Sequence, residues 1–352
     1  CKSTKVNQKR FDHDFYTHFN YTKITDFNIF IECEVCKIIY SKRSSFLNKI
    51  YKSIFSKKYE KNRVHKLVAK FDNIQIYKHF INKEIKKRSN LNILDYGNRS
   101  DEQLKEYSNL FYQSKIIFYD ISIKKNLFYY NKKTKTECIL TDKLSDINDK
   151  FDLIFLFNTL QYYVKFKGFF SLVKRTSHHK TKMYVITPSI EINKYFLLLG
   201  DEYFKFTKVG LNNFLVKNLC KKVKILKRDY LTNANFVMVD FSKKSILKKV
   251  NKPSVLDQIS SFFDKQILKI KKINKKKIYV FGTRVNSCFV TKYLKNFKGL
   301  VDDQSNYTHS DYQLLNKISD KDTPILIPYL GPKLKMIKKI LIKKKFKNYL
   351  TL

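Results

Sequence analysis

The residues whose types and spacing suggest chemistry stand at the ends of two short apolar runs. The first run, 92–96, contains Asp95 and leads into Gly97, and the second, 115–119, ends at Asp120. Glycine permits backbone angles that other residues avoid and lets a ligand approach the main chain closely. A carboxylate at the end of a second strand accepts hydrogen bonds from ribose hydroxyls. The spacing therefore predicts a ligand site at the carboxyl ends of neighbouring strands.

These two runs belong to a longer alternation of apolar strands and helix-length segments that begins at Leu91. Such alternation indicates a parallel sheet with crossover helices, so we predict a doubly wound α/β fold. In that fold the ligand lies where the strand order reverses. Seven strands are expected here: 92–96, 115–120, 137–140, 152–157, 182–187, 223–228 and 235–241.

The turn Leu94-Asp95-Tyr96-Gly97 resembles the first motif of class I S-adenosylmethionine-dependent methyltransferases, hydrophobic-Leu-Asp-x-Gly-x-Gly. The runs that end at Asp120 and begin at Phe151 are similar to the second and fourth motifs of that family, and Pro188 follows the fifth strand as it does there. Arg99 replaces the second glycine of the first motif. The resemblance implies a Rossmann-like sheet of seven strands whose last two form an antiparallel edge.

The same resemblance implies S-adenosylmethionine as the cofactor. Asp120 would accept hydrogen bonds from its ribose, Asp142 would face the adenine, and the loop from Asn158 would lie beneath its methionine end. The cofactor-binding residues expected in total are Asp95, Tyr96, Gly97, Asp120, Asp142 and Asn158.

Residues after the fifth strand face the substrate in that family, which makes Glu202 and Tyr203 the candidate catalytic residues. The sugar C-methyltransferases, which the chain resembles in overall plan, carry a Tyr-His-Glu-His motif in this region, and both histidines are missing from 200–207. Proton abstraction next to a ketone would therefore need another base, such as Glu202, or the chain methylates oxygen or nitrogen instead.

Six cysteines are present, and three of them cluster near the start of the chain. Cys33 and Cys36 have the spacing that lets two thiolates bind one structural zinc ion. Zinc takes four ligands, so Cys1 is expected to belong to an upstream pair, and otherwise His13 or His18 would complete the site. The layout resembles the zinc-binding module of the sugar C-methyltransferases. The alternative is a pair of buried thiols.

A second, smaller α/β unit is expected after residue 276. Its first strand, 278–281, is followed by Gly282 and Arg284, and a later strand, 299–302, ends in two aspartates. This resembles the small Rossmann-like domain that ends the sugar C-methyltransferases and helps to enclose a nucleotide sugar. In that case Arg284 or Tyr329 would contact a phosphate or base; a purely structural unit is the alternative.

The formal net charge of +42 raises nucleic acid as a partner. We discount it, because the lysines are spread along the whole chain and the abundance of Lys, Asn, Ile, Tyr and Phe suggests an AT-rich genome. The positive field still favours an anionic small molecule such as a nucleotide sugar. No apolar run reaches the roughly 18 residues of a membrane span, so a cytoplasmic protein is expected.

We therefore expect five parts: a truncated zinc-type module at 1–45, a helical linker or cap at 46–90, a methyltransferase domain at 91–245, a helical connector at 246–276 and a Rossmann-like domain at 277–352. The expected function is methyl transfer from S-adenosylmethionine to a sugar or nucleotide sugar, in polysaccharide biosynthesis. Two alternatives stay open: a catalytically inactive binding protein of the same fold, and an RNA methyltransferase or RNA-binding protein.

Overall fold

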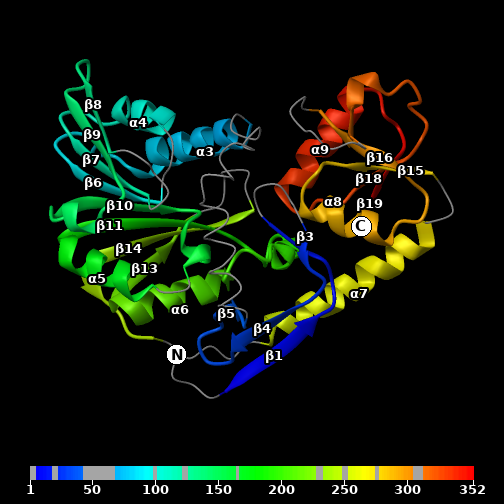
Figure 1. Ribbon diagram of the computed structural model, residues 1–352, viewed down its shortest axis with the longest axis horizontal. Coiled ribbons are helices and arrows are strands. Elements are labelled where there is room, and N and C mark those ends of the chain that lie inside the picture. Colours follow the sequence, from blue (N-terminus) through cyan, green and yellow to red (C-terminus); the bar gives the residue numbers. More distant parts are fainter. Residues whose placement is uncertain are drawn as a thin grey trace.

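A computed structural model of the chain places two α/β units at opposite ends of the long axis (Figure 1). It describes residues 5–17, 23–42, 68–97, 101–120, 126–163, 166–226, 233–247, 253–273, 277–303 and 312–352. Cys1, His18, Arg99 and residues 46–67 of the predicted linker lie outside the described residues. The five predicted domain boundaries stay a prediction.

The larger unit is built on an eight-stranded sheet with the order β13-β14-β11-β10-β6-β7-β9-β8. Its strands are β6 (Asn92–Tyr96), β7 (Lys115–Tyr119), β8 (Leu127–Asn131), β9 (Thr136–Thr141), β10 (Phe151–Phe157), β11 (Ser177–Pro188), β13 (Lys221–Ile225) and β14 (Ala234–Lys244). The five strands from β9 to β11 are parallel, whereas β14 runs antiparallel to β11 and to β13. All seven predicted strands and the predicted antiparallel edge are therefore present.

The eighth strand, β8, is an addition to the seven expected. It forms an antiparallel hairpin with β9 at the far edge of the sheet. The turn between them contains neither glycine nor proline, and Lys135 takes the positive φ of 54° that glycine usually supplies. The turn signal that the sequence does carry is Asn131, whose Oδ1 accepts the N–H of Lys133 at 3.1 Å.

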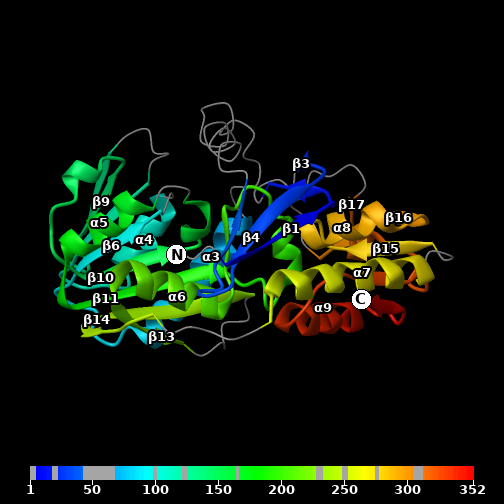
Figure 2. The same cartoon turned by 90° about the horizontal axis from the view of Figure 1, so that it is seen from below.

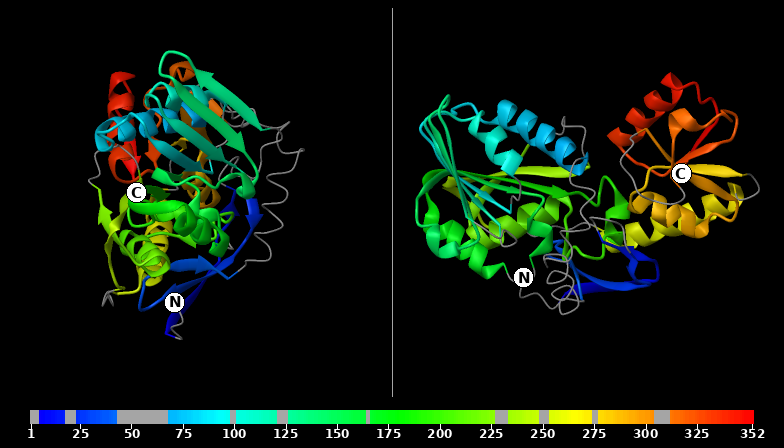
Figure 3. Two further views of the ribbon diagram at one scale, coloured as in Figure 1. Left: turned by 90° about the vertical axis from the view of Figure 1, so that its left-hand side faces the viewer. Right: turned by 45° about the horizontal axis from the view of Figure 1, so that its top comes forward.

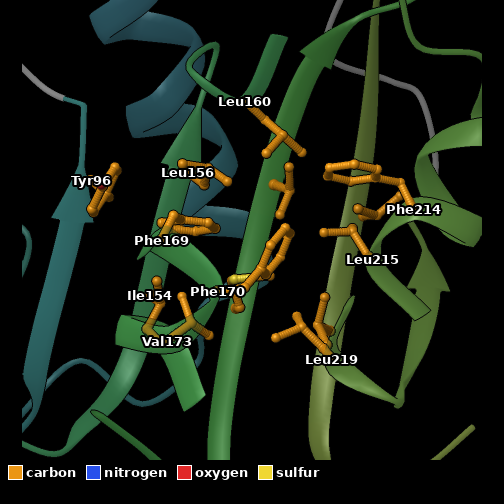
Figure 4. Packing of buried hydrophobic residues seen from close by; sticks show 14 of the residues in the cluster. Tyr96, Ile154, Leu156, Leu160, Phe169, Phe170, Val173, Phe214, Leu215 and Leu219 are labelled. Atoms are coloured by element: carbon orange, nitrogen blue, oxygen red, sulfur yellow. The ribbon is translucent and has the colours of Figure 1, made fainter. Parts of the chain in front are cut away.

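Helices cover both faces of the large sheet, because its central strands are apolar on both sides. On one face lie α3 (Val68–Glu84) and α4 (Asp101–Ser108), and on the other lie α5 (Lys167–Thr176) and α6 (Lys208–Leu219) (Figure 1). Figure 4 shows the second layer, in which Phe169 and Phe170 of α5 and Phe214 of α6 pack on Tyr96 and Leu156 of the sheet. The unit is a three-layer sandwich.

The chain order reverses between β6 and β10. From β6 the chain proceeds outward to β7 and β9, and then returns to place β10 and β11 on the other side of β6. This is the switch point at which doubly wound sheets bind ligands, beyond the carboxyl ends of the strands. Asp95 of β6 lies there between Phe155 of β10 and Phe118 of β7.

The smaller unit repeats this plan with five parallel strands in the order β17-β16-β15-β18-β19. Its strands are β15 (Ile278–Phe281), β16 (Phe297–Asp302), β17 (Tyr312–Leu314), β18 (Ile325–Ile327) and β19 (Tyr349–Thr351), and its helices are α8 (Val285–Tyr293) and α9 (Pro332–Lys343). The long helix α7 (Val255–Ile273) precedes it. The right view of Figure 3 shows the two units side by side, and in the left view the larger unit lies in front of the smaller one.

A small N-terminal sheet lies between the two units (Figure 2). It combines β1 (Val6–Phe11), β4 (Asn28–Cys33) and β5 (Ile39–Ser41) with β12 (Phe204–Lys205), and a separate hairpin joins β2 (Phe15–Tyr16) to β3 (Lys23–Thr25). The buried carboxylate of Glu32 accepts hydrogen bonds from the backbone N–H groups of Val255 and Leu256 at 2.8 and 3.1 Å. Because those N–H groups begin α7, Glu32 caps this helix from another part of the chain.

Within the described part of the chain, no helix is both long and apolar enough to cross a membrane.

Candidate functional site

The loops after β6 and β10 meet at the switch point of the large sheet. Gly97 follows β6 with a φ of +95°, and its N–H donates to the carbonyl of Tyr119 at 2.7 Å. A Cβ atom at Gly97 would lie 2.3 Å from Oγ1 of Thr159. Glycine is required here both by the backbone angle and by this close approach.

Asp95 and Tyr96 point to opposite faces of the sheet, as neighbouring residues of a strand must. Asp95 is 2% exposed and lies on the side of Ile93, which packs against α3 and α4. On that side burial, together with the Asp95 charge, raises the pKa of Tyr107. Asp95 thus connects the end of β6 to the helix layer above it.

Tyr96 belongs to a cluster of aromatic side chains on the other face. Its ring centroid lies 4.6 Å from that of Tyr119, 5.7 Å from Tyr163 and 4.7 Å from Phe169. Burial raises the pKa of Tyr119, and the neighbouring Tyr96 and Asp120 add to the shift. These phenols are therefore neutral hydrogen-bonding groups beside a carboxylate.

Asp120 follows β7 and is 3% exposed, whereas Asp142, after β9, is exposed. Asn158, after β10, has a φ of +51°, and its Nδ2 donates to the Tyr77 hydroxyl at 2.9 Å. The structure thus places the predicted cofactor-binding residues at the carboxyl ends of β6, β7, β9 and β10; β6 and β10 flank the switch point, and Asp142, after β9, lies two strands away from β6. Cofactor binding by these residues stays a prediction.

Sequence reasoning missed four side chains at this edge: Tyr77, Tyr119, Thr159 and Tyr163. Tyr119 directly precedes Asp120, and Thr159 and Tyr163 follow Asn158, so these three could have been found from their position next to predicted site residues. Tyr77 comes from α3, whose position over the switch point depends on tertiary packing.

The candidate catalytic residues lie before β12. Glu202 is 1% exposed, and its Oε2 accepts a hydrogen bond from Nζ of Lys205 at 2.9 Å. Nζ of Lys205 also donates to the carbonyls of Phe196 and Leu199. Burial raises the pKa of Glu202, and the Lys205 charge opposes that shift. Glu202 can act as a base only from within this buried ion pair.

Tyr203 is half-buried and packs against Tyr40 and Phe204, with centroids at 5.9 and 4.7 Å. Its carbonyl accepts the N–H of Ser41 at 2.9 Å, which fixes this segment to the N-terminal sheet. A catalytic role for Glu202 and Tyr203 stays a prediction.

The structural zinc prediction is not supported. Among the described residues, no group of three or more Cys, His, Asp or Glu side chains is arranged to hold a metal ion. Cys33 and Cys36 are buried, with the N–H of Cys36 3.4 Å from Sγ of Cys33, and burial raises the pKa of Cys36 to about 11. His13 lies elsewhere, against Phe263 at 4.9 Å. The Cys33 and Cys36 pair therefore fits the alternative of two buried thiols.

The smaller unit has its own switch point, between β15 and β18. Gly282 follows β15 with a φ of +84°, its N–H donates to the carbonyl of Val301 at 2.7 Å, and a Cβ there would lie 2.2 Å from the Tyr329 hydroxyl. Asp302 ends β16, and burial, with a hydrogen bond to Asp303, raises its pKa to about 7.

Loops from the carboxyl edges of the two sheets touch each other. After β11, Nδ2 of Asn193 lies 3.4 Å from Oδ1 of Asn286 in α8, and Nδ2 of Asn286 donates to the carbonyl of Pro328 at 2.7 Å. A Cβ at Gly331, after β18, would lie 3.3 Å from Oδ1 of Asn233, which precedes β14. Segments near the carboxyl ends of the two sheets are therefore in contact with each other.

No protein-family model and no curated protein matches the chain. Solved structures of methyltransferases overlap part of it. The plantazolicin methyltransferase with S-adenosylhomocysteine is 13% identical, with 58% of this chain and 97% of that chain covered at a TM-score of 0.39. The 1,6-didemethyltoxoflavin-N1-methyltransferase of Burkholderia thailandensis is 8% identical, with 60% and 96% covered at 0.38.

A Nostoc punctiforme protein named as a candidate O-methyltransferase is 12% identical, with 48% of this chain covered at a TM-score of 0.35. The chain spans about half the length of that protein, 55%. Because these TM-scores lie below 0.5, the similarities by themselves assign neither fold nor function.

Proposed function

We propose that the chain is a methyltransferase that moves a methyl group from S-adenosylmethionine to a sugar or nucleotide sugar. The proposal is carried by the switch point of the large sheet, where Gly97 allows close backbone approach and Asp120 ends the second strand. The antiparallel edge of β13 and β14, expected from the resemblance to class I methyltransferases, accompanies it.

The residues at this edge fit the cofactor. Asp120, beside the phenol of Tyr119, would accept the ribose hydroxyls. Gly97 leaves its main chain open to close approach, and Asn158 is held in place by Tyr77. When bound, the cofactor supplies an electrophilic methyl group, and the chain has to orient the acceptor toward it and exclude water.

The acceptor would lie between the two switch points, where Asn193 and Asn286 connect the units. Arg284, at the start of α8, and Asp302 and Asp303, at the end of β16, would face its nucleotide part. Glu202 stays the candidate base because it follows β11, where the resemblance places the substrate, and it would act from within its ion pair with Lys205. Both histidines of the sugar C-methyltransferase motif are missing, so methylation of oxygen or nitrogen, which depends less on a base that removes a proton from carbon, suits this site better.

Calorimetric titration with S-adenosylhomocysteine tests the cofactor site. We expect saturable binding by the wild-type protein and at least a tenfold weaker affinity for Asp120→Asn, because the amide cannot accept both ribose hydroxyls as a carboxylate does. Asp149→Asn is the control: Asp149 is paired with Lys115 at 2.6 Å near the opposite ends of the strands and should not change binding. A folded wild-type protein that gives no heat would contradict the proposal.

One observation favours a second candidate, a binding protein without catalytic activity. Lys205 has no exposed side-chain surface and holds Glu202 through an ion pair while it also binds two carbonyls. Such a lysine stabilises the 196–205 segment whether or not chemistry takes place. Binding of S-adenosylhomocysteine without methyl transfer to any acceptor would support this candidate.

A further inference from the structure

Four buried polar side chains near the ends of β10, β11 and β14 have atoms without a hydrogen-bond partner in the described part of the chain. They are both amide atoms of Gln161, the hydroxyls of Thr187 and Ser189, and Oδ1 of Asn235. Gln161 and Asn235 are 1% and 2% exposed, and Thr187 and Ser189 are 0% exposed. Buried polar groups are nearly always paired, so a group of unpaired ones at one edge needs an explanation.

These side chains come from adjacent elements. Thr187 of β11 lies directly opposite Asn235 of β14. Both lie on the same face of the sheet as Val185 and Val237, two positions away, which is the face covered by α5 and α6. The N–H of Ser189 donates to the carbonyl of Asn233 at 2.9 Å, which continues the same pairing beyond the strands. Gln161 lies in the short helix η3 (Leu160–Tyr162), which contacts β11.

The group also adjoins the cofactor edge along the chain. Gln161 follows Asn158 and Thr159, which pack at the switch point, and the N–H of Asn158 donates to the carbonyl of Ile186 next to Thr187. The four groups thus stand on the β11 side of the switch point, and the cofactor residues Asp120 and Tyr119 stand on the β7 side.

We propose that Gln161, Thr187 and Ser189 form a polar wall of the acceptor site and recognise an uncharged hydroxyl or carbonyl group next to the atom that is methylated. The inference rests on the proposed function. Amides and hydroxyls donate and accept alike, which suits a hydroxyl or a carbonyl. A phosphate, carboxylate or ammonium group would need an opposite charge in a buried wall, and this wall offers only neutral groups.

Two threonines of β11 provide a matched test. Thr181 is 0% exposed like Thr187, but its Oγ1 donates to the carbonyl of Phe151 at 2.6 Å and accepts the N–H of His178 at 2.8 Å. Valine replaces the hydroxyl by a methyl group of similar size. We expect Thr181→Val to lower the melting temperature by about 2–6 °C and Thr187→Val to leave it unchanged or raise it.

A functional readout uses Thr187→Val and Gln161→Met with S-adenosylhomocysteine and with a panel of acceptors. The panel contains uncharged reacting groups (UDP-glucose, glucose, catechol) and charged ones (benzoate, lysine), with transfer of a labelled methyl group as the signal. We expect transfer to an uncharged group, an unchanged affinity for S-adenosylhomocysteine, and a KM for the acceptor that rises about 2- to 10-fold per lost hydrogen bond.

The possible failures are distinguishable. A wild-type protein that does not bind S-adenosylhomocysteine contradicts the proposed function. A Thr187→Val variant that loses as much stability as Thr181→Val shows that its hydroxyl is paired within the fold, and this overturns the wall. Binding of S-adenosylhomocysteine with transfer only to charged groups, with no transfer to the panel, or with an unchanged acceptor KM also overturns it.

Discussion

The two α/β units have the same backbone arrangement at the turn that follows their first strand. In each, a glycine with positive φ follows the first strand and donates its N–H to the second strand at 2.7 Å: Gly97 to Tyr119, and Gly282 to Val301. In each, the chain after the strand across the switch point, β10 or β18, packs so closely on this glycine that a Cβ atom would collide with it. The shared strand order places these contacts at equivalent positions.

The side chains over the glycine differ. In the larger unit it is Thr159, a small residue whose Oγ1 donates to the carbonyl of Phe157 at 3.0 Å. In the smaller unit it is the ring of Tyr329, which packs against Phe281 with centroids 6.2 Å apart. A large ring occupies space over the turn where a ligand would approach the main chain.

The acidic residues at the second strand differ as well. Asp120 lies beside the phenols of Tyr96 and Tyr119, whereas Asp302 lies next to Asp303 and has a pKa near neutrality. Although the two units share a strand order around the switch point, these side chains make the larger unit better suited to bind a cofactor that contains a ribose. The smaller unit is better suited to a supporting role. Strand order determines where a ligand can bind, and the side chains over the turn determine whether it fits.

The largest effect is expected from alanine at the two glycines. At Gly97 the new Cβ meets three atoms of Thr159, its Cβ included, at 2.3–2.8 Å, whereas at Gly282 it meets only the hydroxyl end of the longer Tyr329 side chain, far from that residue's backbone. Together with the positive φ, Gly97→Ala should lower the free energy of unfolding by about 3–5 kcal/mol and Gly282→Ala by about 1–3 kcal/mol. Denaturant titration measures both.

Calorimetry on the same variants tests which of the two units binds S-adenosylhomocysteine. Binding of S-adenosylhomocysteine should be lost in Gly97→Ala and retained in Gly282→Ala. Replacing Thr159 by glycine in the Gly97→Ala variant removes the colliding atoms and should restore part of the stability, since only the strain in φ remains. Equal losses in both units would contradict the difference drawn here between Thr159 and Tyr329.

Much of the large sheet could be predicted from sequence, because each parallel strand is an apolar run that ends in a polar turn residue. Asp95, Gly97 and Asp120 marked its switch point in the same way. The strands β17 and β19 were missed, since a three-residue strand carries too little pattern to be recognised. The hairpin of β8 was missed because Lys135 takes the place of a turn glycine.

The chemistry of the site was less predictable. The spacing of Cys33 and Cys36 is the same for a zinc ligand pair and for two buried thiols, so the pattern alone does not distinguish them, and within the described residues no third ligand lies with them. Lys205 reads as one more lysine in a chain with a net charge of +42, and only the folded structure reveals that it is buried against Glu202. Sequence patterns report burial of apolar residues, whereas buried polar pairs depend on distant contacts.

A smaller effect is expected from the titration of Asp302. Its folded-state pKa of about 7 lies above the ordinary value of 3.8, so the native protein holds the proton more tightly than the unfolded chain. This stabilisation is complete below about pH 4 and is lost as the pH rises through 7. Asp302→Asn should remove the dependence, on the order of 2 kcal/mol, and be the more stable protein at pH 8. Urea titrations at pH 4 to 8 measure it; parallel curves for both proteins would show that Asp302 is ionised in the native state.

The smallest effect is expected at the contact between the units. The amides of Asn193 and Asn286 are buried and lie 3.4–3.5 Å apart, which is long for a hydrogen bond. A double-mutant cycle with Asn193→Ala and Asn286→Ala should give a coupling energy of about 0.5–1 kcal/mol. Each single variant also removes a hydrogen bond of its own: Asn286→Ala removes the one to the carbonyl of Pro328 at 2.7 Å, and Asn193→Ala removes the one from the N–H of Tyr195 at 3.3 Å. A coupling energy of zero would mean that the Asn193–Asn286 contact does not stabilise the boundary between the two units.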